Sequence, residues 1–475
     1  MSYMNCRVKR AGLGGALLWG ILELILLLPT TVWAGGRTVM VPPPNGVDDT
    51  ANIQGALNKC VKYGPGCTVQ LQAGTYLTKQ VVVYNFQGTF KGMSSNRTTI
   101  QALYPLFVNI PDAYFNGECM PNITTCLWPT LFVFVDGNIQ VSDVNLMELA
   151  PPGMATTGWY GAGTETTDLL DLLRFMGKNP TNVSIERIAM EGLPDDSPTS
   201  SGFDVISGVT YTGELPRSTT PFDYYFLSGT FTVSNSSFST MDDGVGQDGF
   251  LQSGHIVIGG SPSAGNHFEN TYAGMDMGTS ESSVFDISYN TSLGIYAGIL
   301  VEPWLSVFVP SSPSIYSIHD NKFIGTGYFG DGIFLYDDAT NPWIQAAVWN
   351  NTVEVQNLIE EGIGVYNTKG TAVWNNSVTG SDGTDGIGLW STTLDTVINN
   401  NVSNFTLDPT IGLAQIYLDP STTYDLVVCA ERSNTVLNQG TNNTIVGCQQ
   451  STASAEAATS VTRPNLLRKK PPLRK

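Results

Sequence analysis

The stretch GDGIFLYDDA, Gly330–Ala339, recurs in altered form as EEGIGVYNTK at Glu360–Lys369 and as TDGIGLWSTT at Thr384–Thr393. Each copy places an acidic residue before a glycine, continues with alternating apolar residues and then reaches an aromatic side chain. Alternation with a period of two is the pattern of a β-strand that buries one face. The sequence therefore predicts the same short strand at three places along the chain.

A second series of short phrases keeps the same step along the chain. In each phrase an asparagine stands three residues after an apolar residue, as in VWNNTV from Val348. The asparagines are Asn290, Asn321, Asn351, Asn376 and Asn400, at intervals of 31, 30, 25 and 24 residues. The glycines that keep step with them are Gly298, Gly332, Gly362, Gly386 and Gly412. Self-similarity at this period indicates a solenoid.

The repeats favour an all-β fold, a right-handed, single-stranded parallel β-helix in which each repeat forms one coil. Short strands alternate with turns rich in Gly, Asn, Asp and Ser, and no helical pattern lies between them. That pattern disfavours leucine-rich and helical repeats. We expect the repeated asparagine at a bend, where it tolerates left-handed backbone and hydrogen-bonds the coils on either side.

The amino-terminal part of the repeat region predicts a cap. The stretch NGVDDTANIQGALNKC, Asn45–Cys60, predicts a helix over about 49–60, with Asp48 or Asp49 as its N-cap and apolar residues at helical spacing. A first strand pair follows, ending in AGTY and the residues after it. An amphipathic helix at this place would cover the open end of the coil stack and its unpaired strand edge.

This Asp-Asp-Thr-Ala, helix and AGTY order resembles the start of pectin-lyase-like β-helix proteins. The resemblance covers Asn45 to about Gln101, and beyond it only the repeat pattern is similar. The group includes bacterial polysaccharide-degrading enzymes and phage tailspikes. The resemblance therefore implies a secreted protein that acts on polysaccharides.

The chain divides into three parts. Residues 1–34 hold three basic residues, an apolar run and small residues before Gly35, the pattern of a signal peptide cleaved after Ala34; a single-pass anchor is the alternative. The β-helix domain spans 35–450, with long loops over about 102–230 and regular coils over about 231–450. The basic tail, 451–475, is low in complexity and is expected to be disordered. We expect secretion, to the extracellular space or the periplasm.

Cysteine usage agrees with export. Of seven cysteines, Cys6 belongs to the leader, and the other six lie in local pairs. Pairing by proximity predicts three disulfides in an oxidising compartment. The predicted bonds are Cys60–Cys67, Cys119–Cys126 and Cys429–Cys448.

The charge of the chain limits its partners. The whole sequence has 22 basic and 41 acidic residues, and between Arg217 and Arg432 the only basic residues are Lys322 and Lys369. Such a surface repels nucleic acid and anionic membranes. It would also repel a polyuronate unless calcium intervened. We expect a monomer whose partner is a glycan, with no membrane contact after removal of the leader.

Aligning the coils places one acid of each repeated strand in a single column, spaced by about 4.8 Å. The column holds Asp331, Glu361 and Asp385. Adjacent members lie near the carboxyl separation of retaining glycosidases and alternate members near that of inverting ones. A turn-stabilising role is the alternative, because aspartate is favoured in turns. Calcium is a further candidate ligand of these acids.

Two outward columns carry aromatic side chains. Tyr336, Tyr366 and Trp390 follow Glu302 in one column, and Trp349 and Trp374 follow His319 in the other. Flat rings suit the apolar faces of sugars, so these residues are candidate substrate contacts. The alternative is cross-strand stacking that serves the sheet alone.

A third candidate group lies in the stretch from Ser236 to Ser261, which places Asp242, Asp243, Asp248 and His255 within about one coil. Asp242 and Asp243, followed by Gly254 and His255, resemble the Asp-Asp and Gly-His segments of polygalacturonase-type hydrolases. Ser201 stands where that family has an upstream aspartate, and no Arg-x-Lys follows. These departures disfavour a galacturonate substrate, whose carboxylate needs such cations.

We therefore expect a glycoside hydrolase that uses paired carboxylates on a neutral or weakly charged glycan. The acids are drawn first from Asp242, Asp243 and Asp248 with His255, and second from the Asp331 column. A calcium-assisted polysaccharide lyase, with Lys322 or Lys369 or a His319 and Tyr336 pair as its base, is an alternative. A glycan-binding or adhesion β-helix without catalysis is the other. No cofactor is required by the hydrolase.

Overall fold

The computed structural model consists of two units, Met1–Gly36 and Arg37–Lys475, and the helix and strands that are described belong to the second unit. The residues that the structure describes are 36–103, 130–147, 171–177, 181–192, 207–213, 227–248, 251–278, 280–294, 297–302, 312–325, 331–337, 343–355, 361–380, 385–405, 414–430 and 434–451. The predicted signal peptide, the Cys119–Cys126 pair and the tail beyond Ser451 lie outside them.

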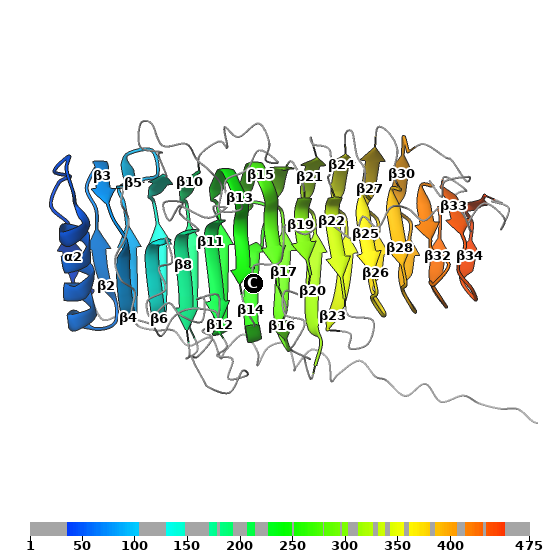
Figure 1. Cartoon of the computed structure of the whole chain (residues 1–475), viewed down its shortest axis with the longest axis horizontal. Coiled ribbons are helices and arrows are strands. Elements are labelled where there is room, and N and C mark those ends of the chain that lie inside the picture. Colours follow the sequence, from blue (N-terminus) through cyan, green and yellow to red (C-terminus); the bar gives the residue numbers. More distant parts are fainter. Residues whose placement is uncertain are drawn as a thin grey trace, which may run out of the picture. The chain divides into compact units, whose positions relative to one another are not determined.

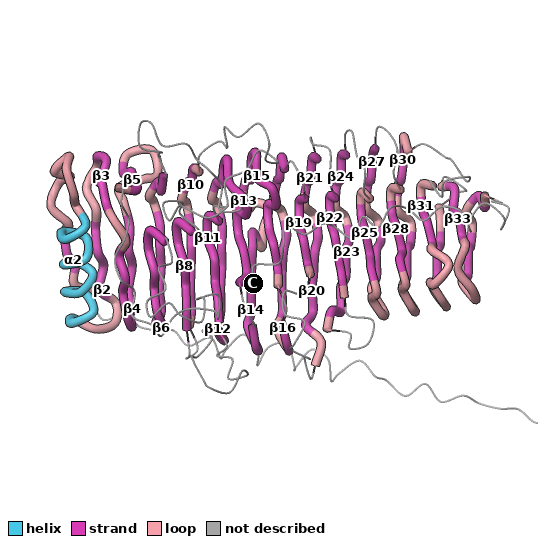
Figure 2. Tube along the Cα trace, in the orientation of Figure 1, coloured by secondary structure: helices cyan, strands magenta, loops and turns pink. Residues whose placement is uncertain are grey.

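The second unit is a parallel β-helix, as the repeats predict. Strands follow one another in chain order along the stack, from the blue amino-terminal end to the red carboxyl-terminal end (Figure 1). All pairings between named strands are parallel, and each coil contributes to three sheets. Figure 2 shows the strands of successive coils side by side, with loops at the corners.

Sheet 1 contains strands whose outward side chains include the second aromatic column. Its members in stacking order are β1 (Thr38–Met40), β2 (Cys67–Gln70), the second parts of β4 (Val81–Lys91) and β6 (Thr130–Ser142), β9 (Asn182–Glu186), β12 (Leu227–Ser234), β14 (Leu251–Gly259) with β16 (Ser280–Glu281) beside its start, β17 (Val284–Ser288), β20 (Ser314–His319), β23 (Ile344–Trp349), β26 (Ala372–Trp374), β29 (Thr396–Ile398), β32 (Leu426–Val428) and β34 (Thr444–Val446).

Sheet 2 follows sheet 1 within each coil. Its members are β3 (Gly74–Thr78), β5 (Thr98–Ala102), β7 (Asn145–Met147), β10 (Ala189–Glu191), the first parts of β13 (Ser237–Asp248) and β15 (His267–Met277), β18 (Thr291–Gly294), β21 (Lys322–Gly325), β24 (Thr352–Val355), β27 (Ser377–Gly380) and β30 (Asn401–Ser403).

Sheet 3 completes the coil and carries the repeated strand of the opening stretch. Its members are the first parts of β4 and β6, β8 (Asp171–Gly177), β11 (Ser207–Gly213), the second parts of β13 and β15, β19 (Ala297–Val301), β22 (Asp331–Tyr336), β25 (Ile363–Tyr366), β28 (Ile387–Trp390), β31 (Ile416–Leu418), β33 (Thr435–Asn438) and β35 (Gln449–Gln450).

The interval 102–230, expected to hold long loops, also contains strands β6 to β11 and so contributes full faces to the stack. Its strands carry apolar residues such as Phe132, Phe134 and Phe175, which are fully buried. The prediction missed them because long stretches of other composition separate the strands and hide the repeat period.

The repeated asparagines form a buried ladder at the corner between sheets 1 and 2. Asn351 is typical: its Oδ1 accepts from the backbone N–H and the Nδ2 of Asn321, and its Nδ2 donates to Asn376. The expectation of left-handed backbone at these asparagines was wrong by one residue. The positive φ angles belong to the preceding residues, such as Asn350 at 55°, because the chain must turn before the ladder side chain can point inward.

Helix α2 (Thr50–Tyr63) caps the first coil, as predicted. It ends three residues later than expected, at Tyr63, and is followed by Gly64, whose φ is 83°. Asp49 precedes the helix, but its carboxylate makes no capping bond and accepts instead from the N–H of Leu77. The amide of Gln54 donates to the carbonyl of Val82 and accepts from its N–H. The helix thus satisfies strand groups that an open end would leave unpaired.

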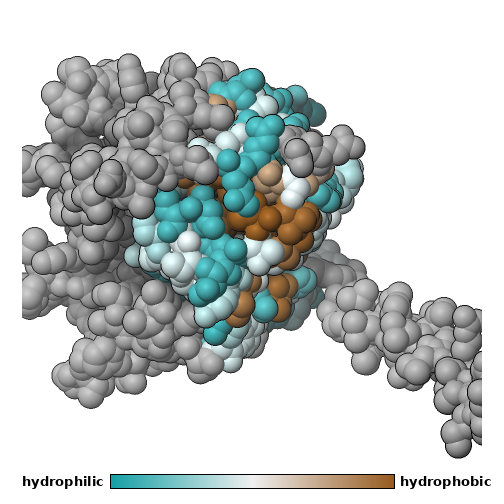
Figure 3. All heavy atoms as spheres, turned by 90° about the vertical axis from the view of Figure 1, so that its right-hand side faces the viewer, coloured by the Kyte–Doolittle hydropathy of each residue, from teal (hydrophilic) through white to brown (hydrophobic). Residues whose placement is uncertain are grey.

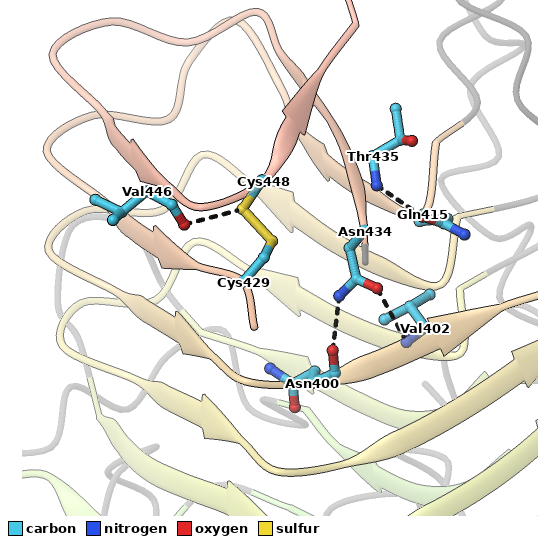
Figure 4. Close-up of a disulfide and its surroundings, with 8 residues drawn as sticks. All are labelled: Asn400, Val402, Gln415, Cys429, Asn434, Thr435, Val446 and Cys448. Carbon is cyan, nitrogen blue, oxygen red and sulfur yellow. Dashed lines mark hydrogen bonds between the residues drawn. A yellow bond between two sulfur atoms is a disulfide. The ribbon is translucent and has the colours of Figure 1, made fainter. Parts of the chain in front are cut away.

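Two of the three predicted disulfides lie in described residues and are confirmed. Cys60–Cys67 joins α2 to β2, with 5.4 Å between the Cα atoms. Cys429–Cys448 joins the last two coils, with 5.0 Å between the Cα atoms (Figure 4). In the same corner Asn434 donates to the carbonyl of Asn400 and accepts from the N–H of Val402.

The end of the stack beyond this disulfide has an apolar middle. Figure 3 shows it as a brown band framed by hydrophilic residues. Val446, on β34, is 49% exposed, whereas Val436 and Leu437 of the same end are buried. Within the described residues, no helix is long and apolar enough to cross a membrane.

Candidate functional site

Asp243 of the first set and the acids of the second set lie in one column on the outward side of sheet 3. Asp243 of β13 pairs with Ala273, Ala273 with Ala297, and Ala297 with Asp331. Two alanines therefore separate Asp243 from Asp331. Asp243 lies three strand spacings from Asp331, roughly 14 Å, which is too far for the two to act as a catalytic pair.

The second set continues this column on consecutive coils. Its acids each precede by two residues an isoleucine that pairs directly with the next, and the isoleucines are Ile333, Ile363 and Ile387. Asp331, Glu361 and Asp385 are all buried. The predicted alignment of these three acids is therefore present, in a setting shielded from solvent.

Two of the three acids support the coil next to them. Oδ1 of Asp331 accepts from the N–H of Glu361 at 3.1 Å. Oδ1 of Asp385 accepts from the N–H of Ala414 at 2.6 Å. Both bonds satisfy a backbone donor of the adjacent coil. This is the turn-stabilising role that was the alternative to catalysis for these acids. Glu361 differs, because its Oε2 accepts from the hydroxyl of Tyr366 at 2.7 Å.

Two glycines make room for the Glu361 side chain. Gly364 and Gly388 pair with each other, between Phe334 on one side and Tyr417 on the other. A Cβ on Gly388 would lie 2.8 Å from Cγ of Glu361, closer than real Cβ contacts allow. A Cβ on Gly364 would lie 3.5 Å from Oε2 of the same side chain. These glycines form a notch that the carboxylate occupies.

The first aromatic column lines the notch, but its ring faces are covered by neighbouring rings of the same column. Tyr366 and Trp390 stack with their planes 4° apart and centroids 5.8 Å apart. Tyr336 lies 6.3 Å from Tyr366, and Tyr417 lies 4.9 Å from Trp390. Rings stacked along the helix axis cover one another, so a glycan running along the column would meet ring edges more than faces.

The second aromatic column behaves in the same way on sheet 1. His319 stacks on Trp349 at 4.2 Å, and Trp349 on Trp374 at 5.0 Å. The imidazole also lies between two carboxylates, with Nδ1 2.8 Å from Asp320 and Nε2 3.3 Å from Asp286. Because Tyr336 lies on sheet 3, His319 and Tyr336 are on different sheets. The pair suggested for a lyase is therefore not assembled.

The first-choice acids are likewise not gathered with their histidine. His255 is exposed on β14 of sheet 1, where it pairs with Thr230 and Val284. Asp243 lies on β13 in the sheet 3 column. The side chains of Asp242 and Asp248 lie outside the description. Residues within one coil are close in sequence, but each corner moves the chain to another face.

Two charged residues on this face, Asp276 and Arg174, escaped the sequence reasoning. Asp276 is buried on sheet 3 between the two acid sets, as is Glu302 at the head of the first aromatic column, and Arg174 is buried in the column of Asp276. The sequence could reveal them only through the register of the strands, and long insertions between those strands obscure that register. The glycines at 364 and 388 were visible, because they replace Phe334 in the repeated phrase.

The bases proposed for a lyase lie elsewhere. Lys322 is exposed on sheet 2 and pairs with Glu354 at 3.3 Å, and Lys369 is exposed at the corner between sheets 3 and 1. Among the described residues, no group of three or more His, Cys, Asp or Glu side chains is arranged to hold a metal ion.

Comparisons with known proteins find similar structures but no similar sequences. No family model matches the chain, and no curated protein matches it. The A-module of a mannuronan C-5 epimerase from Azotobacter vinelandii is 12% identical, with a TM-score of 0.41 over 85% of this chain and 96% of that one.

Two further structures have similar scores. The catalytic unit of an α-1,3-glucanase from Streptomyces thermodiastaticus is 14% identical, with a TM-score of 0.41 over 89% of this chain and 71% of that one. A family 28 exopolygalacturonase from Yersinia enterocolitica is 12% identical, with a TM-score of 0.38 over 88% and 77%. These values describe a likeness of fold and carry nothing about function.

Proposed function

We propose that the protein is an exported glycoside hydrolase that acts on a neutral or weakly charged polysaccharide at the sheet 3 notch. The observation that carries the proposal is the bond from Tyr366 to Glu361, which sets one carboxylate apart within a column of three. Export is supported by the two disulfides, which persist in oxidising compartments.

The hydrogen bond suggests which carboxyl group is ionised during the reaction and which ones can donate the proton. A phenol that donates to a carboxylate stabilises its charged form, so we assign Glu361 as the nucleophile. Its oxygen bonds to the anomeric carbon as the glycosidic carbon–oxygen bond breaks, and the leaving oxygen takes a proton from a carboxylic acid, Asp331 or Asp385. Water then returns a proton to that same residue, and the water oxygen bonds to the anomeric carbon as the bond to Glu361 breaks. Neighbouring members of the column lie near the carboxyl separation of retaining enzymes, which this double displacement needs.

The charge of the face supports a neutral substrate. Asp276, Glu302 and the three column acids are buried along sheet 3, and Arg174 is the basic residue described there. A polyuronate would bring further negative charge to this face without enough cations to pair with it.

A product screen on neutral and acidic polysaccharides tests the activity. New reducing ends without absorbance of unsaturated uronates identify a hydrolase, and both signals together identify a lyase. Glu361→Gln keeps the size of the side chain and an acceptor for Tyr366, and should lower kcat by at least 100-fold. Glu354→Gln, the same change on sheet 2, is the control. Full activity in Glu361→Gln refutes the assignment.

Glycan binding without catalysis is the second candidate. It is favoured by the burial of all three column acids and by the backbone bonds of Asp331 and Asp385. The same screen decides, because a binding protein retains polysaccharide on an affinity gel and releases neither product.

A further inference from the structure

The corner between sheets 1 and 2 turns through a single left-handed residue in most coils. Asn350, Asn375 and Asn399 hold this position with φ between 54° and 55°, and Asp320 holds it in the preceding coil. Asparagine and aspartate adopt left-handed backbone more readily than other residues with side chains. In these coils, the choice of asparagine or aspartate at the corner follows from the positive φ that the turn requires.

Two corner residues depart from this rule. Arg187 has a φ of 54° and Tyr289 a φ of 61°. A bulky residue in this region is unfavourable and calls for a local reason. Both residues line the same cavity, a groove of about 660 Å³ that runs along the corner. We call it the corner groove.

Two longer loops shape the corner groove. Residues 92–97 join β4 to β5, and residues 260–266 join β14 to β15, whereas the coils between them turn through Asp143, Arg187 and Asn235. Both loops line the groove. From the first loop to Tyr289 is five strand spacings, roughly 24 Å. The groove is long enough for a chain ligand.

The groove is polar but balanced in charge. Asp143 and Arg187 form a two-bond pair, with Nε to Oδ1 at 2.7 Å and Nη2 to Oδ2 at 3.1 Å. The guanidinium also pairs with Glu186. The pair lowers the pKa of Asp143, which keeps its carboxylate ionised. Arg187 is thus already matched by acids and offers no net positive charge to an anion.

The remaining lining is rich in hydrogen-bonding groups. Around the ion pair lie hydroxyl, amide, imidazole and phenol side chains, among them Ser95, Asn235, Ser263, His267 and Tyr289. Sugars present hydroxyls that both donate and accept, together with C–H faces that suit an aromatic ring. Apolar side chains are few in the lining, which disfavours a lipid or an apolar peptide.

We propose that the corner groove binds a neutral oligosaccharide, at a site separate from the sheet 3 notch. The Asp143–Arg187 pair presents fixed donors and acceptors to neighbouring hydroxyls, and Tyr289 contacts the sugar at the far end of the groove. The proposal does not depend on catalysis at Glu361. It gives the chain a second contact with a polymeric glycan.

Tyr289→Asn and Arg187→Asn test the groove, because asparagine is the residue that other coils place at this corner. Both variants should fold, and Tyr289→Asn should melt at the temperature of the unmodified protein or above it. Binding of cellotetraose, xylotetraose, mannotetraose and maltotetraose is measured by calorimetry, with tetragalacturonate as the anionic comparison. At least one neutral tetrasaccharide should bind, and each variant should weaken its Kd at least tenfold.

Asp320→Asn, one coil beyond the groove, should bind as the unmodified protein does. The proposal is overturned if none of the four neutral probes binds. Unchanged Kd in Tyr289→Asn overturns it as well. An equal loss in Glu361→Gln would assign the binding to sheet 3 instead. Loss of hydrolysis in Glu361→Gln with intact tetrasaccharide binding would keep the two sites distinct.

Discussion

At the corner between sheets 1 and 2, an asparagine and its left-handed neighbour divide one task in the coils from Asn290 to Asn400. The exposed residue, such as Asn350, adopts the positive φ, and the following one, such as Asn351, turns inward. The inward side chain then satisfies backbone groups of the neighbouring coil that no strand reaches. This explains why the sequence repeats asparagine pairs and why only the second member is buried.

Asn351→Ala should destabilise the protein strongly. The substitution removes four hydrogen bonds, to Asn321, to Asn376 and to the carbonyl of Ile318, and leaves buried partners unsatisfied. We expect a loss of about 3 kcal/mol in the free energy of unfolding, measured by urea denaturation. Asn350→Gly, at the exposed position, should change it little. Equal effects at the two positions would contradict this division of roles.

A second buried ladder, between sheets 3 and 1, contains ionisable groups. Asp395 accepts from the hydroxyl of Thr368 and the N–H of Thr371, and its own N–H donates to Asp425. Burial raises the pKa of Asp395 to about 7. Burial also raises the pKa of Asp425. In the next coil Asn443 takes the same place without a charge.

These shifts predict the direction of a pH effect. An acid whose pKa is higher in the folded state binds more protons when folded, so stability falls as pH rises from about 4 to about 7. Asp395→Asn should remove this contribution, on the order of a few kcal/mol, because Asn443 shows that the ladder accepts an amide. The variant should gain stability relative to the unmodified protein at pH 7.5 but not at pH 4. Parallel curves of denaturation midpoint against pH would contradict the assignment.

At the scale of the element, the two ends of the stack are protected by different means. At the amino-terminal end α2 covers the core and bonds the edge strand through Gln54. At the other end the Cys429–Cys448 disulfide links the last two coils, and part of the apolar middle of that end is exposed (Figure 3). A solenoid unravels from ends whose strands lack a neighbour, so these devices should govern local stability.

Replacing Cys429 and Cys448 together by serine should loosen the last coils. A disulfide that closes a loop of this length, 19 residues apart in sequence, contributes about 3 kcal/mol. Hydrogen exchange should accelerate in β32 to β35 and stay unchanged in α2. The matched change of Cys60 and Cys67, only seven residues apart, should have a smaller effect on global stability. Uniform acceleration along the chain would show that the end does not fray independently.

For the whole molecule, the distribution of charge distinguishes between neutral and anionic glycans as ligands. The chain carries a formal net charge of −19, and its central coils are almost free of basic residues. We therefore expect both the acids on sheet 3 and the corner groove to disfavour anionic ligands.

Tetragalacturonate should not bind measurably at low salt, where repulsion between like charges is least screened. If weak binding exists, added salt should strengthen it, because screening reduces the repulsion. Affinity for a neutral tetrasaccharide should be almost independent of salt over the same range. Calorimetry at 20 and 300 mM sodium chloride, roughly spanning the screening range, makes the comparison. Tight, salt-sensitive binding of the polyanion would refute this account.

The repeat predicted the coils and the columns, the apolar spacing in Asn45–Cys60 predicted the cap helix, and proximity predicted the two disulfides that lie in described residues. In a solenoid the neighbour in space lies one period away, so a regular spacing such as Asn351 to Asn376 reveals contacts directly. Tertiary structure decided which of these columns are buried, and that the rings of Tyr366 and Trp390 face one another. It also placed His255 and Asp243 on different faces, because each corner redirects the chain by an amount that the sequence does not state. The Glu361 notch and the corner groove depend on how side chains from different coils meet, and only the stacked coils determine that.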